Sequence, residues 1–216
     1  LHTNRDVLAR CGVYYPKSGL RNIAHHEIAR YFVSKIRSVC SQNELSQMQK
    51  TLRELSEEIL NKDRTILLSS EAFQNCEPEL LLEVFEPENT KIIVYLREQV
   101  DYFISSYQQR VHARNEYVSL KEGVRRYIVD YESFLKKWEK VFGRKNIEVR
   151  VYDRCRLFRG DIIHDFMNYL GIEITDDFII SPLDQNPSIG GALLEFKRVL
   201  NAFEIDQTLN RELYGI

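Results

Sequence analysis

Arg97 and Ser105 are the residues whose types and spacing most directly suggest chemistry. Arg97 ends an apolar run at residues 91–96 that is typical of a strand, and a helix is predicted over residues 99–114. A guanidinium beside the N-terminus of a helix suits a phosphate dianion, and Ser105 lies on the polar side of that helix. The structural alternative is a surface ion pair with Asp101. The other side of the helix is an apolar stripe of Val100, Phe103, Ile104, Tyr107 and Val111.

The elements that would position these residues alternate between strands and helices. Strands are predicted at residues 65–69, 91–96 and 146–151, with a short extended piece at residues 13–15. Apolar strands separated by helices of ten or more residues favour βαβ units and a parallel sheet. We therefore predict one α/β domain over residues 1–216, a three-layer α/β/α fold with a mostly parallel central sheet. The predicted helices cover residues 1–10, 23–39, 44–60, 78–85, 99–114, 120–130, 131–142, 161–170 and 189–203.

Ligands of an open parallel sheet bind outside the carboxyl ends of its strands. Two segments of this chain qualify, Ser69-Ser70-Glu71 after the strand at residues 65–69 and Leu96-Arg97-Glu98 after the strand at residues 91–96. We expect the two strands to be parallel members of one sheet, so that Glu71 and Arg97 lie on the same edge.

The composition is that of a globular chain without an extended charged surface. Of 216 residues, 44% are hydrophobic, and 30 basic against 32 acidic residues give a net charge of -2, which offers no nucleic-acid footprint. No apolar run is long enough for a membrane span, and no signal peptide opens the chain. The histidines lack metal-ligand spacing, so no metal is predicted. Four separate cysteines indicate reduced thiols and a cytoplasmic protein: Cys11, Cys40, Cys76 and Cys155.

The segment VYLREQVDYFISSY at residues 94–107 resembles the 3′-phosphate-binding segment of sulfotransferases. In that family a strand ends in Arg and a Ser lies eight positions later. The resemblance implies that Arg97 and Ser105 hold the 3′-phosphate of the sulfuryl donor, 3′-phosphoadenosine-5′-phosphosulfate (PAPS). This chain departs from the family by having Glu98-Gln99 where Asn-Pro is usual.

Other stretches extend the resemblance over most of the chain. Residues 149–154 and 165–172 are similar to the family's late strand, its helix and an ending of the type F-L-G-hydrophobic. Residues 4–26, which include Gly12-Val13-Tyr14-Tyr15-Pro16 and His25-His26, look like bacterial sulfotransferase-like proteins just after their P-loop. The resemblance therefore implies a bacterial protein with a P-loop-containing α/β fold.

The family also uses a loop that binds the 5′-phosphosulfate, and two placements are open. Tyr15-Pro16-Lys17-Ser18-Gly19 is similar to the loop of cytosolic sulfotransferases, but Leu20-Arg21 replaces the Thr-Thr pair that should follow. Alternatively, a strand and the loop precede Leu1, because the first helix begins there without a capping residue. We favour the second placement, in which Lys17 is an ordinary turn residue.

Removing the proton of an acceptor hydroxyl needs a positioned base. The family's base often follows the strand before the Arg-bearing strand, which points to Glu71 here, with His25 as a second and His112 as a third candidate. The alternative for Glu71 is a helix cap. Several sulfotransferase-like proteins also have an Asn and a Ser near the donor late in the chain, which points to Asn186 and Ser188, although capping alone would explain Ser188.

The sequence thus predicts a PAPS-dependent sulfotransferase that transfers a sulfuryl group to an acceptor hydroxyl, with a saccharide as one candidate acceptor. Its partners would be PAPS, the product adenosine 3′,5′-bisphosphate (PAP) and the acceptor, without metal or nucleic acid. The rival hypothesis is a non-catalytic nucleotide- or partner-binding module with the same fold. A P-loop kinase is disfavoured because the sequence has no Walker-type G-K-[ST].

Overall fold

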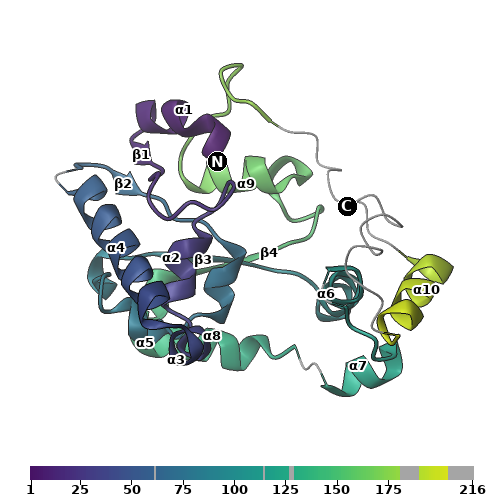
Figure 1. Cartoon of the computed structure of the whole chain (residues 1–216). Helices are drawn as coiled ribbons and strands as arrows, with labels where there is room; N and C mark the ends of the chain where they lie inside the picture. Colours follow the sequence, from purple (N-terminus) through teal and green to yellow (C-terminus); the bar gives the residue numbers. More distant parts are fainter. Residues whose placement is uncertain (61, 114, 127–128, 181–189, 204–216) are drawn as a thin grey trace.

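Helices and short parallel strands alternate along the chain in the computed structural model, which describes residues 1–60, 62–113, 115–126, 129–180 and 190–203 (Figure 1). The predicted α/β class is confirmed. The strands are β1 (Val13–Tyr14), β2 (Thr65–Ile66), β3 (Ile92–Leu96) and β4 (Ile147–Val151). The α-helices are α1 (Arg5–Arg10), α2 (His26–Tyr31), α3 (Ser34–Val39), α4 (Gln42–Ile59), α5 (Pro78–Leu81), α6 (Gln99–Ala113), α7 (Leu120–Arg126), α8 (Tyr131–Phe142), α9 (Ile162–Tyr169) and α10 (Gly191–Asn201). The 3-10 helices are η1 (His2–Asn4), η2 (Glu71–Asn75), η3 (Pro87–Asn89), η4 (Arg144–Asn146) and η5 (Phe158–Gly160).

All four strands pair in parallel, but they form two sheets rather than one. β1 lies beside β2, with Val13 opposite Thr65, and β3 lies beside β4, with Ile92 opposite Ile147. Within the described residues, β2 and β3 are not neighbours in a sheet. The expectation that these two strands share a sheet is therefore wrong for the described chain.

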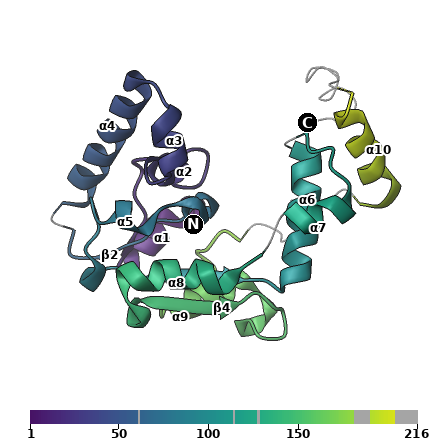
Figure 2. The same ribbon diagram turned by 90° about the horizontal axis from the view of Figure 1, so that it is seen from below.

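Apolar side chains gather in three clusters. The largest lies between α2, α4, α5, α8 and the β3–β4 pair, and it contains Trp138, which is 4% exposed. A second joins α1 and β1 to α9 through Leu8 and Met167. The third joins α6 to α10 through Tyr107 and Leu194. Figures 1 and 2 both show α6, α7 and α10 grouped to one side of the other helices.

The long helix predicted over residues 44–60 is α4, and its start has a clear cause. Ser41 Oγ accepts a hydrogen bond from the amide of Glu44, while the Glu44 carboxylate accepts one from the amide of Ser41 at 2.8 Å. This capping box satisfies amides that would otherwise lack partners. Met48, Leu52 and Leu55 recur at helical spacing, and their burial holds α4 against the largest cluster.

The single helix predicted over residues 23–39 is broken into α2 and α3. The amide of Glu77 donates to the carbonyl of Phe32 at 2.9 Å, and the amide of Ser34 donates to the Glu77 carboxylate at 3.2 Å. Val33, between them, is extended, with φ -103° and ψ 104°. Glu77 thus forms hydrogen bonds with backbone groups that would pair within a continuous helix. Because Glu77 is distant in the sequence, the local pattern of residues 23–39 does not predict the break.

The apolar stripe predicted on α6 is buried over only part of its length. Tyr107 and Val111 are buried against α7 and α10, but Val100 and Ile104 are 60% and 41% exposed. The N-terminal half of α6, next to Arg97, therefore stands away from the packed clusters.

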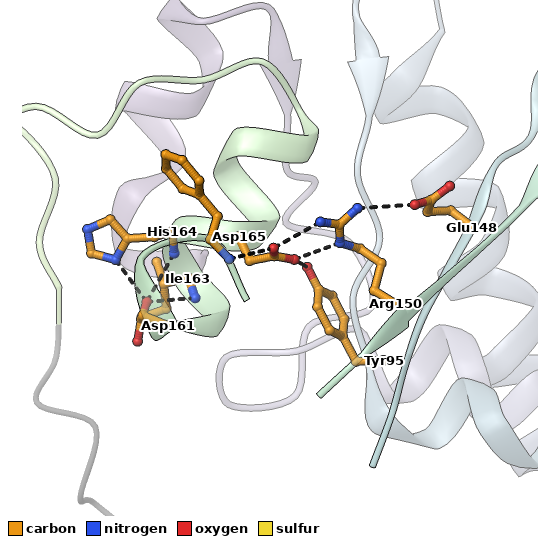
Figure 3. Close-up of polar contacts among 8 residues, drawn as sticks. Tyr95, Glu148, Arg150, Asp161, Ile163, His164 and Asp165 are labelled. Atoms are coloured by element: carbon orange, nitrogen blue, oxygen red, sulfur yellow. Dashed lines mark hydrogen bonds and ion pairs between the residues drawn. The ribbon is translucent and has the colours of Figure 1, made fainter. Parts of the chain in front are cut away.

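Asp165 on α9 connects this helix to both strands of the β3–β4 sheet (Figure 3). Its carboxylate accepts hydrogen bonds from the Tyr95 hydroxyl at 2.8 Å, from Arg150 Nε and Nη2 at 2.6 and 2.9 Å, and from the amide of Phe158 at 2.9 Å. The hydrogen bonds from Arg150 hold the pKa of Asp165 well below its usual range despite burial. Glu148 binds the outer side of the same guanidinium. This network fixes the late strand and helix to β3.

Candidate functional site

Arg97 directly follows β3 and presents a partly exposed guanidinium. The Tyr131 hydroxyl donates to the Arg97 carbonyl at 2.8 Å, which fixes the backbone where β3 ends. Arg97 Nε lies 3.9 Å from Asp101 Oδ2, and the two side chains are 41% and 61% exposed. An exposed pair at this distance contributes little to stability. The ion pair foreseen as the alternative is present, but it is loose enough for an anion to compete with it.

Ser105 lies one helical turn beyond Asp101, on the same face of α6. It is half-buried, and its hydroxyl makes no side-chain hydrogen bond to the described residues. Arg97 reaches this face through Asp101. The structure therefore places Arg97 beside Asp101, and Ser105 on the same face of α6 as Asp101.

Glu98 fills the N-terminus of α6. Its carboxylate accepts a hydrogen bond from the amide of Asp101 at 2.9 Å. Hydrogen bonds from the amides of Asp101, Val100 and Gln99 hold the pKa of Glu98 below its usual range. The sequence predicts that the N-terminus of this helix favours a phosphate. Because Glu98 already occupies it, an anion at this place must rely on the side chains of Arg97 and Ser105.

The segment that follows β2 meets the start of α6. The Tyr102 hydroxyl on α6 donates to Gln74 Oε1 on η2 at 3.1 Å. Glu71, the predicted base, is the first residue of η2 and is exposed, and no hydrogen bond or ion pair to its carboxylate is seen among the described residues. The segment after β2 and the start of α6 are thus in contact through Gln74 and Tyr102, although β2 and β3 lie in different sheets.

His25 is buried and links the segments that follow β1 and β2. The amide of Ser69 donates to His25 Nδ1 at 3.1 Å, so Nε2 carries the proton and donates to the carbonyl of Pro16 at 3.1 Å. The imidazole packs edge-on against Tyr15 and is 0% exposed, and burial lowers its pKa. The prediction of His25 as a base is corrected, because both ring nitrogens are bonded within the protein and no substrate can reach them.

His26, the adjacent residue, has a different environment and was missed in the sequence analysis. It is half-buried, and its Nδ1 lies 2.8 Å from Oγ of Ser70, the residue that precedes η2. Ser70 Oγ also accepts the amide of Ala72 at 3.0 Å as the cap of η2. The sequence signal was the adjacent pair His25-His26, but nothing in the pattern told which imidazole would face outward.

The backbone of the loop at residues 15–19 already binds a carboxylate of the protein itself, that of Glu58. The amides of Lys17 and Ser18 donate to the two oxygens of the Glu58 carboxylate at 2.8 and 2.7 Å, and the Tyr14 hydroxyl donates to it at 2.8 Å. Burial raises the pKa of Glu58, but hydrogen bonds from Ser18, Lys17 and Tyr14 outweigh it and bring the pKa to about 2. Gly19 adopts φ +74°, and a Cβ there would lie 2.3 Å from Ile28. The loop therefore ties β1 to α4.

The remaining predicted residues contribute less to this picture. His112 is half-buried in the last turn of α6, about two turns beyond Ser105. Asn186 and Ser188 lie outside the described residues.

Across the described ranges, no group of three His, Cys, Asp or Glu side chains is arranged to bind a metal ion. In the same part of the chain, no helix combines the length and apolarity needed to cross a bilayer. The four cysteines carry free thiols.

Comparisons with known proteins give limited similarity. No family model matches the chain. An uncharacterized protein of Archaeoglobus fulgidus is 32% identical over 127 residues, which cover 57% of this chain and 34% of that protein. The chain thus spans about a third of the length of this curated relative. A sulfotransferase from Alicyclobacillus acidocaldarius superposes with a TM-score of 0.44 and 16% identity, covering 96% of this chain and 92% of that one.

Proposed function

We propose that this protein transfers a sulfuryl group from PAPS to an acceptor hydroxyl. The observation that carries the proposal is the partly exposed Arg97 guanidinium just beyond β3, beside Asp101 on the face of α6 that also carries Ser105. Arginine binds phosphate through a fixed fork of donors, and a serine hydroxyl adds one hydrogen bond. The resemblance of residues 94–107 to the sulfotransferase 3′-phosphate segment supports the same assignment.

In the proposed reaction, the acceptor oxygen attacks the sulfur of PAPS in line with the leaving group. The O–H bond of the acceptor breaks and its O–S bond forms, while the S–O bond to the 5′-phosphate breaks and PAP leaves. Arg97 and Ser105 anchor the 3′-phosphate and so position the donor. The proton passes to a base at the end of β2, for which Glu71 is the residue predicted from the sequence.

The loop that holds the reacting end of PAPS is proposed to lie in a segment encoded before Leu1. Glu58 supports this placement, because it occupies the amides of Lys17 and Ser18 that a phosphosulfate would need. The strand that precedes this loop would lie between β2 and β3 and join the two sheets into one. Two-stranded sheets are marginally stable alone, so a shared central strand has a physical rationale.

Binding of PAP tests the proposal directly. PAP and AMP share the 5′-phosphate and differ by the 3′-phosphate, so a site built on Arg97 should prefer PAP. A charge-assisted contact is worth about 1.5–3 kcal/mol, or about 10- to 150-fold in affinity. We expect titration calorimetry of the full-length protein to show this preference and Arg97→Ala to abolish it.

Asp101→Asn is the matched control for this measurement. It removes the carboxylate that competes for the same guanidinium, so the affinity for PAP should rise rather than fall. Equal affinities for PAP and AMP in the unmodified protein would refute the proposed donor site.

A non-catalytic binding module is the second candidate. The internal carboxylates favour it, since Glu98 and Glu58 occupy backbone amides where a catalyst would be expected to bind its substrate. Preferential binding of PAP without any sulfuryl transfer by the full-length protein would select this alternative.

A further inference from the structure

The two adjacent histidines have different environments: the imidazole of His25 is buried, and that of His26 is partly exposed. His25 has both ring nitrogens bonded inside the protein, to Ser69 and Pro16. His26 is bonded at Nδ1, to Ser70, and within the described residues Nε2 has no hydrogen-bond partner. Because His26 is half-buried, it is held in place and still reaches the surface. Of the two, His26 is the one that a substrate can contact.

Ser70 orients this imidazole. Its hydroxyl oxygen is fixed by the amide of Ala72 at 3.0 Å and has a second lone pair for His26, 2.8 Å away. When Nδ1 carries the proton and donates to Ser70, the lone pair of Nε2 points away from that contact. An imidazole whose one nitrogen is held by a neighbouring oxygen while the other is unoccupied is the usual arrangement of a general base.

The imidazole contacts the segment after β2, from which the proposed function takes its base. Ser70 is the residue between the β2 segment and η2, and η2 contacts α6 through Gln74 and Tyr102. Glu71 follows Ser70, but it is exposed and no described contact orients its carboxylate. A base must be held within hydrogen-bond reach of the proton it removes, and His26 meets this condition better.

We propose that His26 is the catalytic base and that Ser70 is its positioning residue, an inference that rests on the proposed sulfuryl transfer. His26 Nε2 takes the proton as the acceptor O–H bond breaks and the O–S bond forms. The electron pair of the broken S–O bond leaves with PAP. The imidazolium then returns its proton to solvent, and Glu71 is not required for the step.

The acidity of the acceptor tests this assignment. Two probe acceptors are used with PAPS and the full-length protein on the mildly alkaline side of neutral pH: 2-naphthol, which is still largely protonated there, and 4-nitrophenol, which is largely ionised. His26→Asn keeps an amide that can hydrogen-bond to Ser70 but cannot take a proton. We expect it to lower kcat for 2-naphthol by about 10²–10⁴-fold and to change kcat for 4-nitrophenol far less. The affinity for PAP should be unchanged.

Two further variants make the result specific. Free imidazole should restore 2-naphthol transfer by His26→Ala, whereas Glu71→Gln tests the carboxylate that the sequence predicts as the base. Equal losses for both acceptors, no rescue by imidazole, or a selective loss in Glu71→Gln would each overturn the assignment to His26. Absence of transfer by the unmodified protein would overturn the assignment together with the proposed function, whereas normal 2-naphthol transfer by His26→Asn would overturn the assignment alone.

Discussion

Asp165 is the single residue on which the junction of β3, β4 and α9 most depends. Asp165→Asn would keep the shape of the side chain but leave the Arg150 guanidinium without its buried counter-charge. Breaking such a pair costs about 3–5 kcal/mol, and we expect urea unfolding at neutral pH to show a loss of this order. Glu148→Gln is the control, because Glu148 binds the outer side of the same guanidinium and is 40% exposed. Equal losses in the two variants would contradict a special role for the buried carboxylate.

The two adjacent histidines, His25 and His26, show what could not be predicted from the sequence at the scale of single residues. Asp101 and Ser105 lie four positions apart on one helix, so the face that they share could be predicted. His25 and His26 have the same local sequence context, and their roles diverge through partners far along the chain, Ser69 for one and Ser70 for the other. Glu98 was recognised as a departure from the family, but its role as a cap on α6 emerged from the structure.

At the scale of elements, Glu58 joins the last turn of α4 to the loop after β1. We expect Glu58→Gln to lower the free energy of unfolding by about 2 kcal/mol at neutral pH, since charged hydrogen bonds contribute about that much. Its folded-state pKa of about 2 lies below the ordinary value of 4.5. The stabilisation is therefore present above pH 4.5 and lost as the pH falls toward 2.

Denaturant unfolding over a pH series measures this effect. The difference between the unmodified protein and Glu58→Gln should shrink steadily as the pH falls below the ordinary carboxyl range. Glu57→Gln, on the exposed side of the same helix, should show little difference at any pH. A constant difference between the unmodified protein and Glu58→Gln down to acidic pH would argue against the carboxylate as its source.

Elements with a strong pattern of their own could be predicted, and those shaped by distant contacts could not. The start of α4 is marked by Ser41 and Glu44, three residues apart, so its position follows from local chemistry. The break between α2 and α3 depends on Glu77, more than forty positions away from Phe32 and Ser34. The paired part of the second strand is shorter than its apolar run, because β1 offers few residues to pair with it.

At the scale of the whole molecule, the strands are less buried than their apolar sequences predict. The run at residues 91–96 has the composition of a central strand, yet all five residues of β3 are only partly buried. β3 pairs with β4 on one side, and in the described chain no strand pairs with its other side. The same is true of β2, which pairs with β1. Both observations support the proposed strand between the two sheets.

Hydrogen exchange can detect that strand. In a chain extended by the proposed strand and loop before Leu1, the amides of β2 and β3 should exchange more slowly than in residues 1–216 alone, because a neighbouring strand would pair with their free sides. The α8 helix is the internal control, since the hydrogen bonds within the helix protect its amides whether or not a strand pairs with β2 and β3, and it should exchange alike in both proteins. The peptide covering Ile92–Leu96 is the most informative, because β3 has the longest free side. Equal exchange of this peptide in the two proteins, with α8 also unchanged, would show that no strand is inserted between β2 and β3.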